Sequence, residues 1–138
     1  MTPTRSEAAM LQPLPAVDRF LDAVRNATID ECDAWASDVL LDATVPNWRM
    51  HRRGVEDLRA TYRGWFADPG EFETLRRIPI PTGEVVDYLL AWQEDGVPHT
   101  AHHLHVLDVV DDRIVADTVL CGGRWPAGLM AEMEAADA

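Results

Sequence analysis

The stretch FETLRRIPIPTGEVVDYLLAWQEDGVPHTAHHLHVLDVVDDRIVADTVLCG, residues 72–122, decides the fold of this 138-residue chain. It contains four runs rich in aliphatic, aromatic and β-branched side chains: 72–80, 84–93, 99–110 and 113–122. The sequences PTG, EDGV and DD between them are short turn signals that join consecutive antiparallel strands. The stretch therefore predicts a four-stranded antiparallel meander.

The segment before this meander contains two helical patterns. Apolar residues recur every three or four positions over 15–26, which predicts an amphipathic helix. A second such pattern covers 55–66 and stops at the DPG of 68–70. We therefore expect two helices to supply apolar faces to the core.

The region between these helices predicts a short helix and a strand. Thr28 and Glu31 have the spacing of a capping box, so we expect a short helix that turns Cys32 and Trp35 inward. The apolar, β-branched run VLLDATV that follows predicts a strand near 39–46.

These elements together predict a single α+β domain. Long strands twist and coil, so a curved mixed β-sheet would wrap around the N-terminal helices as a cone with an interior pocket. The expected order is α-α-β-α-β-β-β-β, a cystatin-like roll. We expect a flexible N-terminal tail at 1–13, the domain at 14–126, and a short C-terminal helix or tail at 127–138.

Composition excludes several classes of function. The net charge of −12 argues against a surface for nucleic acid or anionic membrane, because such surfaces neutralise phosphates with basic residues. All twelve basic residues are arginine, which excludes Schiff-base and pyridoxal-phosphate chemistry anchored on a lysine. Neither of the two serines lies in a G-x-S-x-G motif, so serine-hydrolase chemistry is not expected.

The cysteines and the hydropathy pattern indicate a cytoplasmic protein. Cys32 and Cys121 lie far apart without C-x-x-C spacing, as expected of buried thiols in a reducing compartment rather than of a disulfide. Residues 1–13 lack the apolar run of a signal peptide, and no stretch is long and apolar enough to span a membrane.

Four of the five histidines lie within 99–105, on a predicted strand. If the DD sequence forms the following turn, His105 lies opposite Thr118, and both share the pocket face with His103. Asp117 and Cys121 then lie on the outer face. A one-residue change of register would invert this assignment.

His103 and His105 admit three interpretations. As catalysts, imidazoles with a pKa near ~6.5 could both accept and donate a proton. As wall residues, they could bind a ligand or water without chemistry. As a metal site, the H-x-H pair would need a third ligand, and the predicted inner face supplies none. We therefore expect no metal and no cofactor.

Three local strings resemble the nuclear transport factor 2-like superfamily: DRFLDAV, LLDATVPNW and DDRIVADTV, within residues 16–125. This superfamily includes SnoaL-type polyketide cyclases, ketosteroid isomerases and scytalone dehydratase. The resemblance implies that His103 and His105 match strand positions where relatives place pocket residues, and that the protein is a homodimer.

The sequence also departs from these relatives. Asn47 stands where ketosteroid isomerases have a base aspartate, and Phe20 where they have the oxyanion-hole tyrosine. The histidines of scytalone dehydratase have no match in 84–93, and the Arg/Asp pair of limonene-epoxide hydrolases is not visible in the strands. We therefore do not expect a ketosteroid isomerase.

The leading hypothesis is a cofactor-independent lyase, isomerase or cyclase that acts on a small, apolar, oxygenated, polyketide- or terpenoid-like molecule. His105 and His103 would be catalytic. The candidate substrate-binding residues are Asn47, Trp48, Tyr88, Trp92, Thr118 and Phe20. The alternative is a small-molecule binding or accessory protein of the same fold without turnover.

Two further expectations concern the surface. The outer sheet face should present Leu104, Val106, Val115 and Val119, an apolar patch through which two copies would pair. His51 is expected in a loop at the rim of the pocket, while His99 and His102 should lie at the surface.

Overall fold

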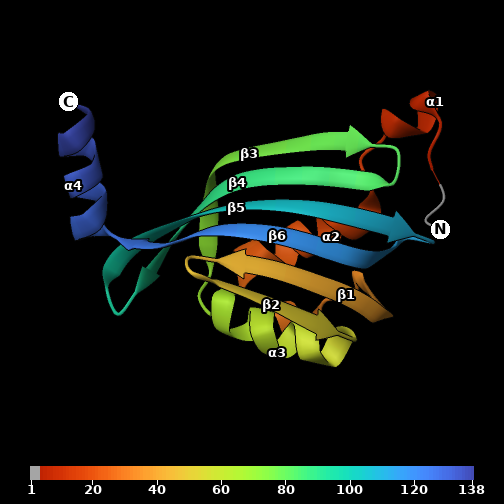
Figure 1. Ribbon diagram of the computed structural model, residues 1–138, viewed down its shortest axis with the longest axis horizontal. Helices are drawn as coiled ribbons and strands as arrows, with labels where there is room; N and C mark the ends of the chain where they lie inside the picture. The colour runs from red at the N-terminus through yellow and green to blue at the C-terminus, as the bar shows by residue number, and fades with distance from the viewer. Residues whose placement is uncertain (1–3) are drawn as a thin grey trace.

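The computed structural model describes residues 4–138 and contains one curved, mixed, six-stranded sheet (Figure 1). The strand order is β2-β1-β6-β5-β4-β3; β1 and β6 run parallel, and every other neighbouring pair is antiparallel. The strands are β1 (Trp35–Val45), β2 (Trp48–Arg53), β3 (Gly70–Ile80), β4 (Gly83–Glu94), β5 (Val97–Val110) and β6 (Arg113–Pro126). The predicted meander is β3 to β6.

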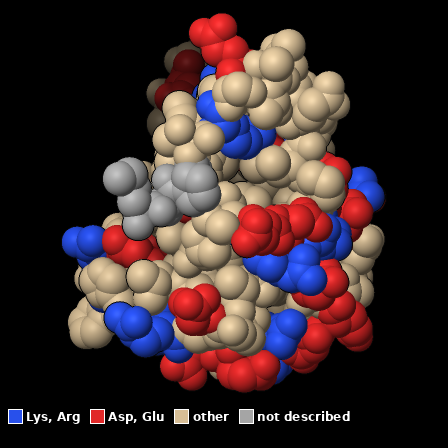
Figure 2. Space-filling model, turned by 90° about the vertical axis from the view of Figure 1, so that its right-hand side faces the viewer, with Lys and Arg blue, Asp and Glu red and all other residues tan. Residues whose placement is uncertain are grey.

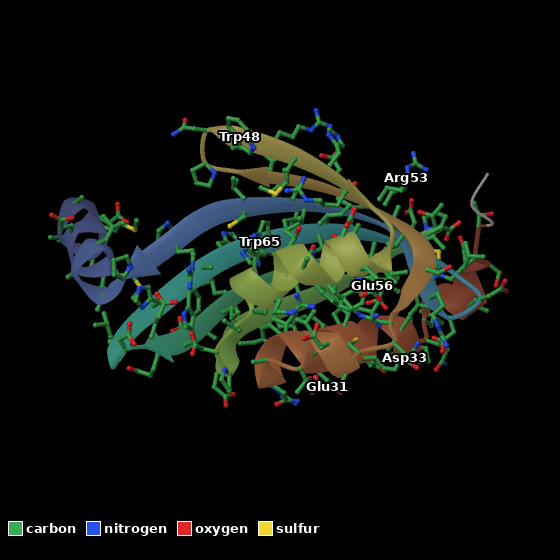
Figure 3. The ribbon with its side chains drawn as sticks, turned by 90° about the horizontal axis from the view of Figure 1, so that it is seen from below. Glu31, Asp33, Trp48, Arg53, Glu56 and Trp65 are labelled. Atoms are coloured by element: carbon green, nitrogen blue, oxygen red, sulfur yellow. The ribbon has the colours of Figure 1, made fainter. Side chains whose placement is uncertain are left out.

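Two helices cover the inner, concave face of this sheet, as Figures 1 and 3 show. Helix α2 (Pro15–Asn26) begins with proline at a helix N-terminus, where no hydrogen bond is lost, and ends at Ala27 in the left-handed conformation. Helix α3 (Val55–Trp65) buries Leu58 and Tyr62. Both helices pack apolar side chains on the strands, and this forms the core.

Two β-bulges in β6 decide which side chains face this core. Val115 has no partner on β5, so Leu107 lies opposite Asp117 and His105 opposite Val119. A second irregularity lies at Gly122 and Gly123, as the paired glycines suggest. A bulge adds one residue to one strand, so every side chain beyond it moves to the other face.

The predicted register of this hairpin is therefore wrong beyond Val115. His103 and His105 face inward as predicted, since the parity of β5 is unchanged. On β6, however, Asp117 is buried, whereas Thr118 is exposed on the outer face. Cys121 lies opposite His103, on the inner side.

Two other local predictions also differ from the structure. Residues Ile29–Glu31 form a single 3-10 turn rather than an α-helix, and Thr28 makes no side-chain capping bond within the described chain. Cys32 and Trp35 are buried as expected, but Trp35 begins β1. His51 lies in β2 rather than in a loop; β2 is an exposed edge strand, and its sequence lacks the alternation of a half-buried strand.

The segments outside the core are helical. Within the expected tail, residues Glu7–Met10 form the one-turn helix α1, and Arg5 hydrogen-bonds backbone carbonyls at the β3–β4 turn. Helix α4 (Ala127–Asp137) follows β6 and projects beyond the ends of the strands (Figure 1). No helix in residues 4–138 is long and apolar enough to cross a membrane.

Ion pairs join the elements at the end of the molecule that carries the β5–β6 turn. Arg19 of α2 contacts Asp112 in this turn at 2.9 Å and Asp33 at 2.8 Å. Figure 2 views this end and shows acidic and basic side chains lying next to one another. The cavity described below lies at the opposite end of the sheet.

Candidate active site

A continuous chain of buried hydrogen bonds crosses the inner face of β4, β5 and β6. Asp117 Oδ1 lies 2.9 Å from His105 Nδ1, and His105 Nε2 lies 2.9 Å from the Tyr88 hydroxyl. The same hydroxyl lies 2.8 Å from His103 Nδ1. These four side chains, from three adjacent strands, form what we call the buried relay: Asp117, His105, Tyr88 and His103.

The pleat and the Val115 bulge together assemble this relay. His103 and His105 are two residues apart on β5, so both point inward. Tyr88 is the partner of His103 across the β4–β5 ladder, and its ring stacks on His105 at a centroid distance of 5.6 Å. The bulge turns the Asp117 carboxylate toward His105.

Helices α2 and α3 seal the inner end of the relay. Tyr62 of α3 donates its hydroxyl to Asp117 Oδ2 at 2.5 Å. Phe20 of α2 contacts the His105 ring edge-on at a centroid distance of 5.0 Å. His105 and Asp117 are both fully inaccessible to solvent. Both oxygens of the buried carboxylate thus accept a hydrogen bond, as a buried charge requires.

Burial disfavours the charged forms of Tyr62, Tyr88 and His103. Desolvation, reinforced by the Asp117 carboxylate, raises the pKa of Tyr62 and of Tyr88 well above the ordinary value of a phenol. Desolvation, with the nearby His105 as a smaller cause, lowers the pKa of His103 to about 3. His103 is therefore a neutral imidazole at physiological pH.

The outer end of the relay opens into a cavity of about 290 Å³. His103 lines this cavity, whereas His105 lies behind it. The other lining residues are mostly apolar: Val45, Pro46, Trp65, Leu90, Trp92, Ala101, Cys121, Gly123 and Arg124. Figure 3 shows Trp65 at the C-terminal end of α3, beside the sheet. The cavity is thus an apolar space whose inner polar group is His103.

The mouth of the cavity carries a stack of charged and aromatic groups. The Arg124 guanidinium lies 5.2 Å from the centre of the Trp92 ring, and the His99 ring stacks on Trp92 at 5.6 Å. Arg124 also hydrogen-bonds Glu94, and this ion pair lowers the pKa of the Glu94 carboxyl. Glu94 is therefore the acidic partner of Arg124.

The structure brings some of the predicted site residues together. His103 and Trp92 line the cavity, Tyr88 joins the two histidines, and Phe20 packs against His105. His105 lies in the relay but is separated from the cavity by Tyr88 and His103. Of these residues, His103 and Trp92 are therefore placed to contact a ligand in the cavity. His105, Tyr88 and Phe20 do not line it.

Three predicted substrate-binding residues lie elsewhere. Asn47 occupies the exposed β1–β2 turn with a φ of 65°, in the left-handed region that asparagine tolerates. Trp48 is 69% exposed on the outside of that turn, as Figure 3 shows. Thr118 faces outward because of the Val115 bulge. None of the three lines the cavity.

Sequence reasoning missed Asp117, Tyr62, Trp65 and Cys121. The predicted register places Asp117 on the outer face because nothing in RIVADTVL marks a bulge at Val115. Tyr62 and Trp65 fit a helix with an apolar face, and their spacing does not distinguish a core residue from a cavity wall. The one available signal was an acid in the middle of an apolar strand, because such an acid is buried only when it has a partner.

The relay does not resemble a metal site. Within residues 4–138, no group of three or more histidine, cysteine, aspartate or glutamate side chains is placed to hold a metal ion. The facing nitrogens of His103 and His105 are both taken by the Tyr88 hydroxyl. The H-x-H pair is therefore committed to a hydrogen-bond chain.

Comparisons with known proteins identify the fold. No protein-family model and no curated protein matches the sequence. Among solved structures, an NTF-2-like protein of unknown function from Burkholderia xenovorans LB400 superposes with a TM-score of 0.55 at 16% identity, over 78% of this chain and 80% of that chain. An LEH-like epoxide hydrolase from M. tuberculosis gives 0.60 at 20% identity, over 78% and 80%.

A presumed isomerase from Bacillus subtilis gives a TM-score of 0.62 at 10% identity, over 86% of this chain and 90% of that chain. Identities this low establish a shared fold, and the fold hosts more than one chemistry. The architecture predicted from the sequence is confirmed: the chain has the nuclear transport factor 2-like fold.

Proposed function

We propose that the protein is a cofactor-independent acid–base enzyme, an isomerase, lyase or cyclase, whose substrate occupies the cavity. The observation that carries this proposal is His103, an ionisable group at the inner wall of an apolar cavity and hydrogen-bonded to the rest of the buried relay. Solved structures of the same fold include an epoxide hydrolase and a presumed isomerase, which is consistent with such chemistry.

His103 has one ring nitrogen free for a substrate. Tyr88 occupies Nδ1, and Nε2 has no hydrogen-bond partner within the described residues. A neutral imidazole can accept a proton through Nε2 or donate one, and such proton transfer typically accelerates a reaction by about 10²–10⁴-fold. His103 is thus the group that would contact the reacting atoms.

The cavity supports a substrate of modest size with few polar groups. A cavity of ~150 Å³ holds benzene, so about 290 Å³ suits a molecule of roughly two rings. Trp65, Leu90 and Trp92 offer apolar contacts to its body. An oxygen that activates a neighbouring C–H bond would lie near His103. Small polyketide- or terpenoid-like molecules have this chemistry.

A binding protein without turnover is the second candidate function. The low pKa of His103 favours it, because an imidazolium that forms only near pH 3 makes His103 acting alone a weak base at neutral pH. In that case His103 would donate or accept a hydrogen bond to a ligand and move no proton. The two functions predict different results when His103 is replaced.

A ligand screen followed by a turnover assay tests the proposal. Small oxygenated polyketides and terpenoids are added to the wild-type protein, and those that raise its melting temperature are incubated with it and followed by NMR. His103→Gln should still bind a hit but convert it about 10²–10⁴-fold more slowly. His102→Gln, the adjacent change on the outer face, is the matched control and should retain turnover.

Two outcomes would contradict the enzyme. Ligands that bind but are never converted support the binding protein. Turnover that His103→Gln leaves unchanged would remove His103 from the chemistry. Either result leaves the fold and the cavity as described.

We also propose that two copies pair through the outer face of the sheet. Leu40, Ile78 and Leu120 expose apolar side chains on this face, and the predicted Leu104 and Val106 lie between them, half-buried. Such an apolar patch is typical of an interface. Val119, expected in this patch, is instead buried in the core, and Val115 lies in the bulge.

A further inference from the structure

We propose that the buried relay works as one proton-transfer unit: a proton enters at His103 Nε2, and the positive charge comes to rest on His105 beside Asp117. Tyr88 passes the proton between the two rings. This inference rests on the proposed function only for the source of the proton, a substrate in the cavity. The transfer itself can be tested without a substrate.

With Asp117 a carboxylate and His103 neutral, two arrangements of hydrogens satisfy all three hydrogen bonds. In the first, His105 Nδ1–H donates to Asp117, the Tyr88 hydroxyl donates to His105 Nε2, and His103 Nδ1–H donates to the Tyr88 oxygen. His103 Nε2 is then bare, and the residue that carries it lines the cavity. Both rings are neutral in this arrangement.

In the second arrangement, His105 carries a proton on both nitrogens and donates to Asp117 and to the Tyr88 oxygen. The Tyr88 hydroxyl now donates to His103 Nδ1, so His103 carries its proton on Nε2. All three hydrogen bonds persist, with the two that involve Tyr88 reversed. The second arrangement holds one more proton than the first, and that proton has entered from the cavity.

The transfer balances as follows. A substrate C–H or O–H gives its proton to His103 Nε2, His103 gives its Nδ1 proton to the Tyr88 oxygen, and Tyr88 gives its hydroxyl proton to His105 Nε2. The substrate becomes an anion and His105 becomes an imidazolium. The reverse transfer returns a proton to the same or another substrate atom, which is the requirement for an isomerisation.

The surroundings of the two rings explain why the charge would settle on His105. His103 contacts Trp65 at the end of α3 and Phe66 just after it, with ring centroids at 5.5 and 5.6 Å. Its register neighbour on β6 is Cys121. These groups offer no negative charge. Burial accordingly holds the pKa of His103 far below its ordinary value.

His105, by contrast, touches a carboxylate. Around its ring lie Phe20 of α2, Tyr62 of α3, Tyr88 of β4 and Asp117 of β6. Within residues 4–138, Asp117 is the one acidic side chain hydrogen-bonded to either ring of the relay. An opposite charge at hydrogen-bond distance favours the charged form of an imidazole.

Tyr88 transmits the proton without holding a charge. Desolvation and Asp117 raise its pKa well above that of a free phenol, so a Tyr88 phenolate is not a stable intermediate. Tyr88 must therefore gain a proton from one ring as it loses a proton to the other. His102 lies on the opposite face of β5, bound to Asp87, and takes no part in the chain.

Nitrogen NMR of the full chain labelled with ¹⁵N-histidine tests this inference. Near neutral pH both relay histidines should carry their proton on Nδ1. As the pH falls, His103 should move its proton from Nδ1 to Nε2 at the same midpoint at which His105 becomes doubly protonated. Signals are assigned by comparing His103→Gln and His105→Gln.

Three results would overturn the inference: His103 becoming doubly protonated by itself, the two rings changing at different pH values, or neither ring changing before the protein unfolds. Tyr88→Phe cuts the chain, and in this variant His103 should keep one tautomer while His105 titrates alone. Tyr62→Phe is the matched control, since it removes an equally buried hydroxyl that touches Asp117 but lies outside the path. Coupling should persist there.

The same data separate this inference from the proposed function. Coupled titration in a protein that converts no ligand would retain the relay and reject the enzyme. Turnover in a protein whose two histidines titrate independently would retain the enzyme and reject the relay. Circular dichroism of each variant shows whether it is folded before its titration is interpreted.

Discussion

Strand β5 contributes to two histidine–aspartate pairs, one on each face of the sheet, and they differ in burial and in their further partners. His102 Nε2 lies 2.6 Å from Asp87 Oδ1 on the outer face, with the His102 side chain 50% exposed. His105 Nδ1 lies 2.9 Å from Asp117 Oδ1 on the inner face, with both side chains fully buried. Chemical identity and distance therefore do not distinguish the pair that belongs to the site.

The surroundings of the two pairs explain the difference. Asp87 has Arg76 as a second partner. Both partners lower the pKa of the Asp87 carboxyl, and the hydrogen bond from Arg76 is the larger cause. Water can replace either contact at little cost. Asp117 has Tyr62 and His105 as its hydrogen-bond partners, and no water reaches them. Breaking the inner pair therefore leaves buried polar groups without partners.

The largest expected difference between the pairs is in stability. Asp117→Ala leaves the Tyr62 hydroxyl and His105 Nδ1 buried without a partner, so it should lower the free energy of unfolding by about 3–5 kcal/mol. Asp87→Ala should lower it by about 0–1 kcal/mol. Urea denaturation at pH 7 measures both values. Equal losses would show that burial does not separate the two pairs.

The next effect is on the pH dependence of stability. The pKa of His103 is about 3 in the folded protein and 6.5 when unfolded, so the unfolded chain binds more protons between these values. Stability should therefore fall as the pH drops from 6.5 toward 3. For each unit by which the pH falls, the free energy of unfolding of His103→Gln should drop by up to about 1.4 kcal/mol less than that of wild type. His102→Gln should instead follow the wild-type curve; parallel curves for all three would refute the assignment.

The outer face should matter for association rather than for the core. Leu120 lies in the exposed apolar patch and is 51% exposed. Leu120→Asp places a charge in this patch, so it should convert the proposed dimer to a monomer. Light scattering measures the change. Leu129→Asp changes an exposed leucine on α4, away from the patch, and is the control. A wild-type protein that is already monomeric would contradict the proposal.

The smallest effect is expected at Trp48. Its side chain lies outside the cavity, so Trp48→Ala should change the free energy of unfolding by less than about 0.5 kcal/mol and leave ligand binding intact. Trp92→Ala, in the cavity wall, should weaken binding of any ligand found in the screen. Thermal shift with a common ligand compares the two variants. Loss of binding in Trp48→Ala would mean that the β1–β2 turn closes over the ligand.

Most of the fold was accessible to sequence reasoning because its signals are local. Turn sequences at 81–83, 94–97 and 111–112 separate the meander strands, and helical spacing marks α2 and α3. Strand β2 was missed because WRMHRR is an edge strand that buries neither face, so it lacks the alternation of a half-buried strand. The site was accessible only in part: His103 and His105 were found, whereas Asp117 and Tyr62 were not.

The sequence by itself determined the four meander strands, helices α2 and α3, and the inward direction of His103 and His105, because local turn signals and residue periodicity encode them. Tertiary structure alone decided that Asp117 meets His105. That contact depends on one unpaired residue, Val115, in the neighbouring strand. A bulge forms where curvature of the whole sheet around α2 and α3 requires it, and nothing within the strand itself encodes this requirement. The relay therefore depends on the register of β4, β5 and β6.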